Sequence, residues 1–220
     1  METCIEIMEN VNVYLPCRKG SQRVQNKNIR EFAGFKNGLI EIKINQLLEA
    51  HRISKIYLST DDDDIIRFAS KIGDKKIILH KREAKLSTSS TSTDELVTHA
   101  LNLIQEGEIL WTHVTSPFLN SDKYDQIIEK YFDILNCGYD SLMTTCSIHG
   151  FIWSQNGPIN YNRDEEKWPR TQTIEPVHEI NSGAFMANAR IYKKFSDRIG
   201  LKPFLYPLEK IQGFDIDWMD

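Results

Sequence analysis

A short basic loop near the start of the sequence carries the residues best suited to bind a polyphosphate. The apolar, β-branched segment 11–15 predicts a buried strand, and the loop after it holds four cations within ten residues: Arg18, Lys19, Arg23 and Lys27. Guanidinium and ammonium groups, with backbone amides exposed near Gly20, can neutralise a chain of phosphates. The G-x-x-x-x-G-K-S/T spacing of a P-loop is absent. We therefore predict a polyphosphate-binding loop, with a solvated basic loop as the alternative.

Two aspartates near the other end of the sequence form a candidate metal site. In an extended segment, Asp215 and Asp217 share one face, about 6–7 Å apart, while Phe214 and Ile216 face a half-buried side. Two parallel carboxylates repel each other unless a cation lies between them. Mg²⁺ prefers such hard oxygen ligands, and phosphate oxygens and water can complete its shell. The pattern predicts a Mg²⁺ site, with a solvated polar strand as the alternative.

A run of four aspartates, residues 61–64, follows the predicted strand 53–60. Acidic residues stabilise the positive end of a helix dipole, so we expect the run to start a helix over 65–72, capped by Thr60 or Asp61. Asp61 is nearest the strand end and is also placed to face a site.

Smaller polar residues follow other predicted strands. Asn181, Ser182 and Gly183 would let the backbone approach a ligand closely. His113, Thr115 and Ser116 follow the predicted strand 109–114 and can reach a base or ribose. Four scattered cysteines (Cys4, Cys17, Cys137 and Cys146) show neither a C-x-x-C pair nor zinc-type spacing with histidine, which predicts reduced thiols.

The elements around these residues alternate in type. We expect further helices at 39–50, 94–105 (capped by Thr93) and 124–135, and further strands at 76–79 and 141–145. Strands alternating with helices predict an α/β domain with a mainly parallel sheet. Ligands of such sheets bind beyond the carboxyl ends of the strands, where the polar loops above would gather.

One segment, 151–180, breaks this alternation with prolines and a charged run. We interpret it as an insertion within a single domain, 1–220, packed on the sheet or against a second subunit. Its cations Arg163, Lys167 and Arg170 form surface pairs with the acidic run 164–166 or, alternatively, meet a ligand carboxylate.

The bulk composition narrows the function classes. The chain has 220 residues, 40% of them hydrophobic, and a net charge of -4. This balance argues against a nucleic-acid partner, which usually requires a basic face, and against a polybasic membrane anchor. No apolar run reaches the ~18 residues of a membrane span, and the acidic first ten residues do not resemble a secretory signal. We therefore expect a cytoplasmic protein.

In order, these motifs resemble the acylneuraminate cytidylyltransferase family, also called CMP-sialic acid synthetases. Residues 15–28 resemble its opening motif (L/I)-x-A-R-x-x-S-x-R-(L/V)-x-x-K-N, with Cys17 in place of the small residue. STDDDDI, the T-S-P turn at 115–117, INSGAF and FDID resemble its later motifs. The family commonly has Gln-Pro before T-S-P, where this chain has His113 and Val114.

This resemblance implies a Rossmann-like fold, flanked by helices, with a small dimerisation insertion and therefore a homodimer. It implies Mg²⁺-dependent transfer of CMP from CTP to an acidic sugar of the sialic-acid type, with pyrophosphate released. Arg18 and Lys27 would be catalytic, Asp215 and Asp217 would bind Mg²⁺, and Asn181, Ser182 and Gly183 would bind the sugar. The nucleotide-binding residues would be Arg18, Lys19, Ser21, Arg23, Asn28, Thr115 and Ser116.

Three alternatives remain open at this stage. The acceptor could be another acid sugar, of the Kdo, legionaminic or pseudaminic type. A glycosyltransferase with an acidic metal motif would use a ready-made sugar nucleotide and form no pyrophosphate. A binding or scaffold module would show no catalysis at all.

Overall fold

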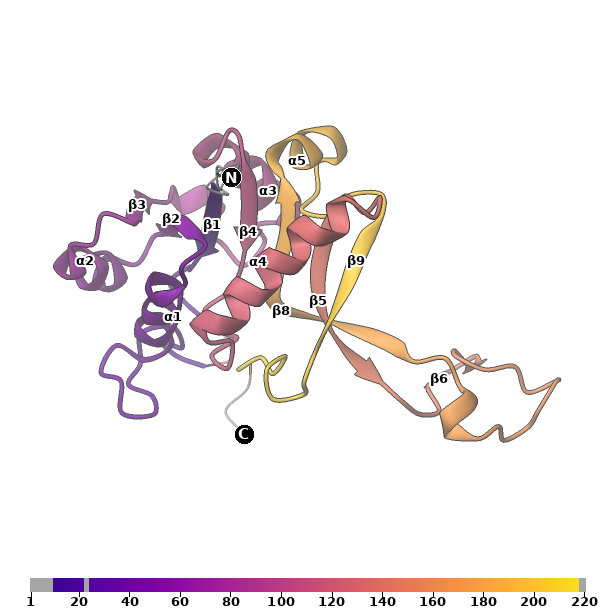
Figure 1. Ribbon diagram of the computed structural model, residues 1–220. Coiled ribbons are helices and arrows are strands. Elements are labelled where there is room, and N and C mark those ends of the chain that lie inside the picture. The colour runs from indigo at the N-terminus through magenta and orange to yellow at the C-terminus, as the bar shows by residue number, and fades with distance from the viewer. Residues whose placement is uncertain (1–9, 22–23, 218–220) are drawn as a thin grey trace.

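The computed structural model describes residues 10–21 and 24–217. Seven strands form one sheet in the order β3-β2-β1-β4-β8-β5-β9 (Figure 1). Strand β8 runs antiparallel to both neighbours, and the other strand pairs are parallel. The strands are β1 (Val11–Pro16), β2 (Ile53–Thr60), β3 (Ile77–Lys81), β4 (Glu108–Trp111), β5 (Ser141–Ile148), β8 (Val177–Asn188) and β9 (Pro203–Leu208). The predicted α/β fold with a mainly parallel sheet is confirmed.

Helices cover both faces of the sheet. They are α1 (Gly38–Glu49), α2 (Asp63–Ile72), α3 (Thr93–Leu103), α4 (Ser121–Leu135) and α5 (Ala189–Phe195), with short 3₁₀ turns at Ala84–Leu86 and Thr171–Thr173. Helices α1, α2 and α4 contribute to one hydrophobic core, and α3 and α5 contribute to the other. Among the described residues, no helix is long and apolar enough to cross a membrane.

The central strand β1 shows why the sheet has two cores. All six of its residues are buried. Because successive side chains of a strand point to opposite faces, Val13 and Leu15 pack with α1 and α4, whereas Tyr14 packs with α3 and α5. Apart from Asn12, β1 is therefore apolar along its length, as parallel strands buried on both sides usually are.

Several predicted boundaries are wrong by a few residues. Helix α2 begins at Asp63 and is capped by Asp62, not by Thr60 or Asp61, because the Asp62 carboxylate accepts a hydrogen bond from the Asp64 amide over 2.9 Å. Helix α3 is capped by Ser92 rather than Thr93, in a reciprocal capping box with Glu95. Strand β4 ends at Trp111 because the chain turns into the loop that carries the T-S-P residues.

The segment 149–176 leaves the body of the molecule as an arm between β5 and β8 (Figure 1). It contains the two-residue strands β6 (Trp153–Ser154) and β7 (Gly157–Pro158), which pair with each other. The predicted insertion therefore lies in this arm and in the start of β8. Its Arg163 guanidinium lies over the rings of Trp153 and Trp168, about 5 Å from each centroid.

The cysteines give no sign of disulfide bonding. Cys17, Cys137 and Cys146 are free, and Cys4 lies outside the described residues.

Candidate active site

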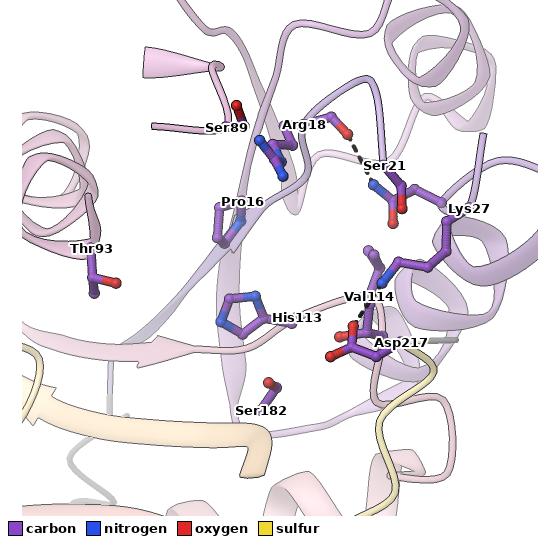
Figure 2. Close-up of a pocket in the computed structure, with 12 residues that line it drawn as sticks. Pro16, Arg18, Ser21, Lys27, Ser89, Thr93, His113, Val114, Ser182 and Asp217 are labelled. Carbon is purple, nitrogen blue, oxygen red and sulfur yellow. Dashed lines mark hydrogen bonds and ion pairs between the residues drawn. The ribbon is translucent and has the colours of Figure 1, made fainter. Parts of the chain in front are cut away.

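A polar cavity of about 650 Å³ opens where β1 and β4 end (Figure 2). It gathers residues from the basic loop, from the loop after β4, from β8 and from the end of the described chain. Its lining consists of Pro16, Arg18, Ser21, Lys27, Asn28, Ser89, Thr93, His113, Val114, Thr115, Ser182 and Asp217. Most of the sequence-predicted site residues therefore lie around one space.

The basic loop is held in shape by hydrogen bonds to β2 and within itself. The Cys17 amide donates to the Ser59 carbonyl over 2.9 Å, and the Lys19 amide donates to the Asp61 carboxylate over 2.8 Å. The Asn28 amide group donates to the Arg18 carbonyl over 3.0 Å. Asp61 thus holds the backbone of the loop and does not line the cavity, and Asn28 shapes the backbone that carries Arg18.

Not every cation of the loop lines the cavity. Arg18 and Lys27 do, but Lys19 does not. Arg23, predicted to bind the nucleotide, lies outside the described residues.

Lys27 connects the basic loop to the segment 214–217. Its ammonium donates to the Asp217 carboxylate and to the Ile216 carbonyl, each over 2.9 Å. The Lys27 side chain is only 10% exposed, whereas that of Asp217 is 43% exposed and lines the cavity. The predicted meeting of a basic loop and an acidic pair is therefore present in the fold.

Asp215 is clasped by two neighbouring segments. One carboxylate oxygen accepts hydrogen bonds from the Ser116 hydroxyl over 2.8 Å and the Thr115 hydroxyl over 3.2 Å. The other oxygen accepts from the Ser182 amide over 3.0 Å. Thr115 and Ser116 therefore fix the orientation of Asp215 in the acidic pair. This role does not depend on any contact with a nucleotide.

The predicted strand over residues 214–217 is wrong. These residues form a loop, and the Phe214 side chain is exposed rather than half-buried. The loop is ordered because the Ile216 amide donates to the Thr115 carbonyl over 2.8 Å and because Ile216 packs on the core. Hydrogen bonds to individual side chains, rather than strand pairing, fix the orientation of the Asp215 and Asp217 carboxylates.

A buried lysine beneath this clasp was missed by the sequence reasoning. The Lys43 ammonium, from α1, donates to the Ser116 carbonyl over 2.7 Å and to the Tyr124 hydroxyl over 2.6 Å. Burial lowers the pKa of Lys43 to about 7, and the nearby Asp215 charge opposes this shift. Lys43 is thus an internal support of the loop that holds Asp215.

A second cavity, of about 610 Å³, adjoins the first and shares Asp217 with it. It lies where the arm joins the body, and its lining consists of Cys146, Ser147, Ile148, His149, Glu179, Ile180, Asn181, Lys210, Gly213, Phe214, Asp215 and Asp217. Of the predicted sugar-binding residues, Asn181 lines this second cavity and Ser182 lines the first.

Gly183, the third predicted sugar-binding residue, lines neither cavity. It is buried, and its carbonyl accepts a hydrogen bond from Thr112 over 2.7 Å. A Cβ at this position would lie within 3 Å of Leu119, Asn181 and Thr144. Gly183 therefore has a packing role: without a side chain it fits this tight space, and Asn181 and Ser182 beside it reach the two cavities.

Ser89 and Thr93 of the cavity lining were also not predicted. The signal that could have found them is the Ser/Thr-rich run 87–93, which follows β3 at the same edge of the sheet. His113 lines the same cavity, and burial lowers its pKa to about 4. His113 therefore adds no charge to the cavity, although Arg18 borders a smaller cavity together with Ser89 and His113.

The acidic pair suits a divalent cation only with help from a ligand. Within residues 10–21 and 24–217, no group of three or more His, Cys, Asp and Glu side chains is arranged to hold a metal. Asp215 and Asp217 supply hard carboxylate oxygens, so phosphate oxygens of a substrate are needed to complete a Mg²⁺ shell.

A mainly parallel sheet with a basic loop after its first strand, facing acidic residues from the end of the chain, defines a nucleotidyltransferase-type protein. The family model described as cytidylyltransferase matches residues 13–214. The chain therefore belongs to the cytidylyltransferase family. This membership confirms the resemblance seen in the motifs.

Two curated relatives agree with this assignment. Pseudaminic acid cytidylyltransferase of Campylobacter jejuni is 33% identical over 129 residues, which are 56% of this chain and 53% of that protein. N-acylneuraminate cytidylyltransferase of Streptococcus agalactiae is 24% identical over 94% of this chain and 50% of that protein. The match thus spans about half the length of these relatives.

The solved structure of CMP:2-keto-3-deoxy-manno-octonic acid synthetase, complexed with CTP, has the same fold. Its TM-score is 0.66 at 14% identity, over 95% of this chain and 93% of that one.

Proposed function

We propose that this protein transfers CMP from CTP to an acidic nonulosonic sugar and releases pyrophosphate. The observation that carries the proposal is the 2.9 Å contact between Lys27 and Asp217, where the cationic end of one cavity meets a second cavity. A reaction between a polyphosphate and a second substrate needs this arrangement of two spaces with charged groups between them.

The first cavity suits the nucleotide. Its cations, Arg18 and Lys27, offer charge to the triphosphate, and Ser21 adds a hydroxyl donor. Its uncharged side chains Ser89, Thr93 and His113 offer hydrogen bonds to the ribose and base. A solved structure with the same fold is complexed with CTP, which supports a nucleotide as the ligand.

The second cavity suits the acid sugar. Asn181 and His149 offer hydrogen bonds to hydroxyl groups, and Lys210 offers a cation to the sugar carboxylate. Asp217 borders both cavities, so an acceptor bound here lies next to the triphosphate end of the first cavity.

The chain's own residues would act by positioning and by charge. The anomeric hydroxyl of the sugar attacks the α-phosphorus of CTP, the new O–P bond forms, the bond to the oxygen that bridges to the β-phosphate breaks, and the hydroxyl proton is released to solvent. Arg18 and Lys27 stabilise the negative charge on the departing pyrophosphate. The clasp on Asp215 and the Lys27 contact to Asp217 hold the two carboxylates for a metal ion. Mg²⁺, when bound, would neutralise phosphate charge and orient the reacting groups.

The printed names of the relatives suggest two acceptor classes. The relative with 33% identity is named for pseudaminic acid, and that with 24% identity is named for N-acylneuraminate. We therefore place a pseudaminic-type acceptor beside the sialic-type acceptor as the second candidate.

The test is to incubate the protein with CTP, Mg²⁺ and separate nonulosonic acids (sialic, pseudaminic, legionaminic and Kdo-type) and to analyse the products by mass. The proposal predicts a CMP-sugar from at least one acid and none from UTP in parallel reactions. Formation of no CMP-sugar from any acid, with folded protein, would reject the proposal. Transfer from a ready-made sugar nucleotide without pyrophosphate would support a glycosyltransferase instead.

We also propose that the arm forms a homodimer interface. Its Trp153, Ile159 and Trp168 side chains are 49%, 60% and 63% exposed, an unusual apolar surface for a projecting segment. A second copy of the chain would cover it. Sedimentation should give twice the chain mass for the wild type and a single mass for the Ile159→Glu, Trp168→Glu double variant. A monomeric wild type at micromolar concentration would contradict the dimer.

The cytoplasmic location of the protein stays a prediction.

A further inference from the structure

His113 occupies a junction within the nucleotide cavity. It lines the main cavity and also a smaller cavity of about 230 Å³, bordered by Arg82 and Ser89. Figure 2 shows its ring projecting into the open space between Pro16 and Ser182. Pro16, Arg18 and Ser89 line both spaces as well.

A neighbouring tryptophan fixes the protonation pattern of the ring. The Trp111 indole N–H donates to the His113 Nε2 over 2.9 Å. An indole nitrogen is only a donor, so Nε2 must be the acceptor, and the single proton of a neutral imidazole must lie on Nδ1. Trp111 is 1% exposed and packs edge-on against Tyr14, with ring centroids 4.7 Å apart. The donor therefore cannot rotate away.

The surroundings of His113 keep the ring neutral. Burial is the largest cause of its lowered pKa, and the positive charges of Arg198 and Lys43 act in the same direction. The carboxylates of Asp215 and Asp217 oppose them but do not reverse the shift. At neutral pH the ring therefore presents one N–H donor and no charge.

We propose that His113 recognises the nucleoside part of the bound nucleotide through a fixed Nδ1–H donor, and that Trp111 is its positioning residue. The inference rests on the proposed function and adds the group that reads the nucleoside rather than the phosphates. A neutral donor attracts a triphosphate only weakly, and Arg18 and Lys27 are already placed to bind the phosphates. The Nδ1–H of His113 suits an oxygen or nitrogen acceptor on the ribose or base.

The first test separates the nucleoside from the phosphates. Calorimetry measures binding of CTP and of inorganic tripolyphosphate to the wild type and to His113→Leu, His113→Asn and Arg18→Ala. We expect His113→Leu to weaken CTP binding about tenfold, the value of one good hydrogen bond, and to leave tripolyphosphate binding unchanged. His113→Asn keeps a donor near the Nδ1 position and should restore most of the affinity. Arg18→Ala should weaken both ligands.

The second test examines the tryptophan. Trp111→Phe keeps an aromatic ring in the core but removes the N–H donor that holds the His113 proton on Nδ1, while the burial that lowers the His113 pKa remains. CTP binding by this variant should weaken, but by less than in His113→Leu, because only part of the population then presents the Nδ1–H donor. Nitrogen-15 spectra of His113 should show the Nδ1–H form in the wild type and a mixture of tautomers in the variant.

Equal weakening of CTP and tripolyphosphate by His113→Leu, or no weakening of either, would overturn this inference. So would a wild-type spectrum with the proton on Nε2. A wild type that binds tripolyphosphate but not CTP would reject the proposed function itself. The wild type is therefore measured with both ligands before any variant is compared.

Discussion

The Lys27 ammonium and the Asp217 carboxylate are 2.9 Å apart, although 190 residues separate them in the chain. The contact joins the loop after the first strand to the end of the described chain, across the edge where the central strands end. It sets a cation that suits phosphates beside a carboxylate that suits a metal ion.

Replacing Lys27 by alanine should lower the rate of pyrophosphate release by on the order of 10², because one fixed charge on the leaving group is lost. The rate is measured with saturating CTP and acceptor. Lys75→Ala, an exposed lysine on the loop before β3, is the matched control and should keep wild-type turnover. A Lys27→Ala protein with full turnover would remove Lys27 from the catalytic set.

Replacing Asp215 by asparagine should raise the Mg²⁺ concentration needed for half-maximal rate and lower the maximal rate by on the order of 10². The amide keeps the size of the carboxylate but not its charge. Direct titration with Mn²⁺ gives a reading that is independent of turnover. Asp133→Asn, on the exposed face of α4, serves as the control. Unchanged metal dependence in Asp215→Asn would argue against a metal site here.

Replacing Lys43 by methionine should make stability respond differently to pH. The folded-state pKa of Lys43 is lowered to about 7 from an ordinary value of 10.5, so between these values the unfolded chain binds more protons than the folded one. The free energy of unfolding of the wild type should therefore rise with pH across this window, relative to Lys43→Met. Denaturant unfolding at pH 7, 8 and 9 measures the difference. A difference that stays constant with pH would mean that Lys43 titrates normally.

Replacing Gly183 by alanine should destabilise the protein by about 1–3 kcal/mol, because the added methyl group overlaps Leu119, Asn181 and Thr144 in a packed interior. One of these neighbours, Asn181, lines the second cavity, so activity should fall as well. Gly150→Ala is the control, since a Cβ there meets nothing within 4 Å. Thermal unfolding and turnover are compared for both variants, and equal melting temperatures would contradict the packing role.

The strands and helices were largely predictable because their burial leaves a periodic pattern in the sequence. Strand β2 spans 53–60 as predicted, and α1 lies within one residue of its predicted bounds. Caps were less predictable, because several adjacent Ser, Thr and Asp residues can each accept the same amide hydrogen bond. In α2 the choice of Asp62 depends on its backbone conformation, which its residue type does not determine.

The site was predictable where residues of one chemical type cluster, as in the basic loop and the aspartate pair. Lys43 could not be found in this way. It interrupts the apolar face of α1, and only its tertiary contacts with Ser116 and Tyr124 show that it supports the site. The role of Gly183 likewise depends on side chains from other elements, which a single segment does not reveal.

The most direct test of the account is to measure pyrophosphate and CMP-sugar together in one reaction with CTP, Mg²⁺ and an accepted acid sugar. The account predicts one pyrophosphate for each CMP-sugar formed, no pyrophosphate when the sugar is omitted, and loss of both products in Lys27→Ala. Pyrophosphate released without an acceptor, or undiminished product from a folded Lys27→Ala protein, would contradict it.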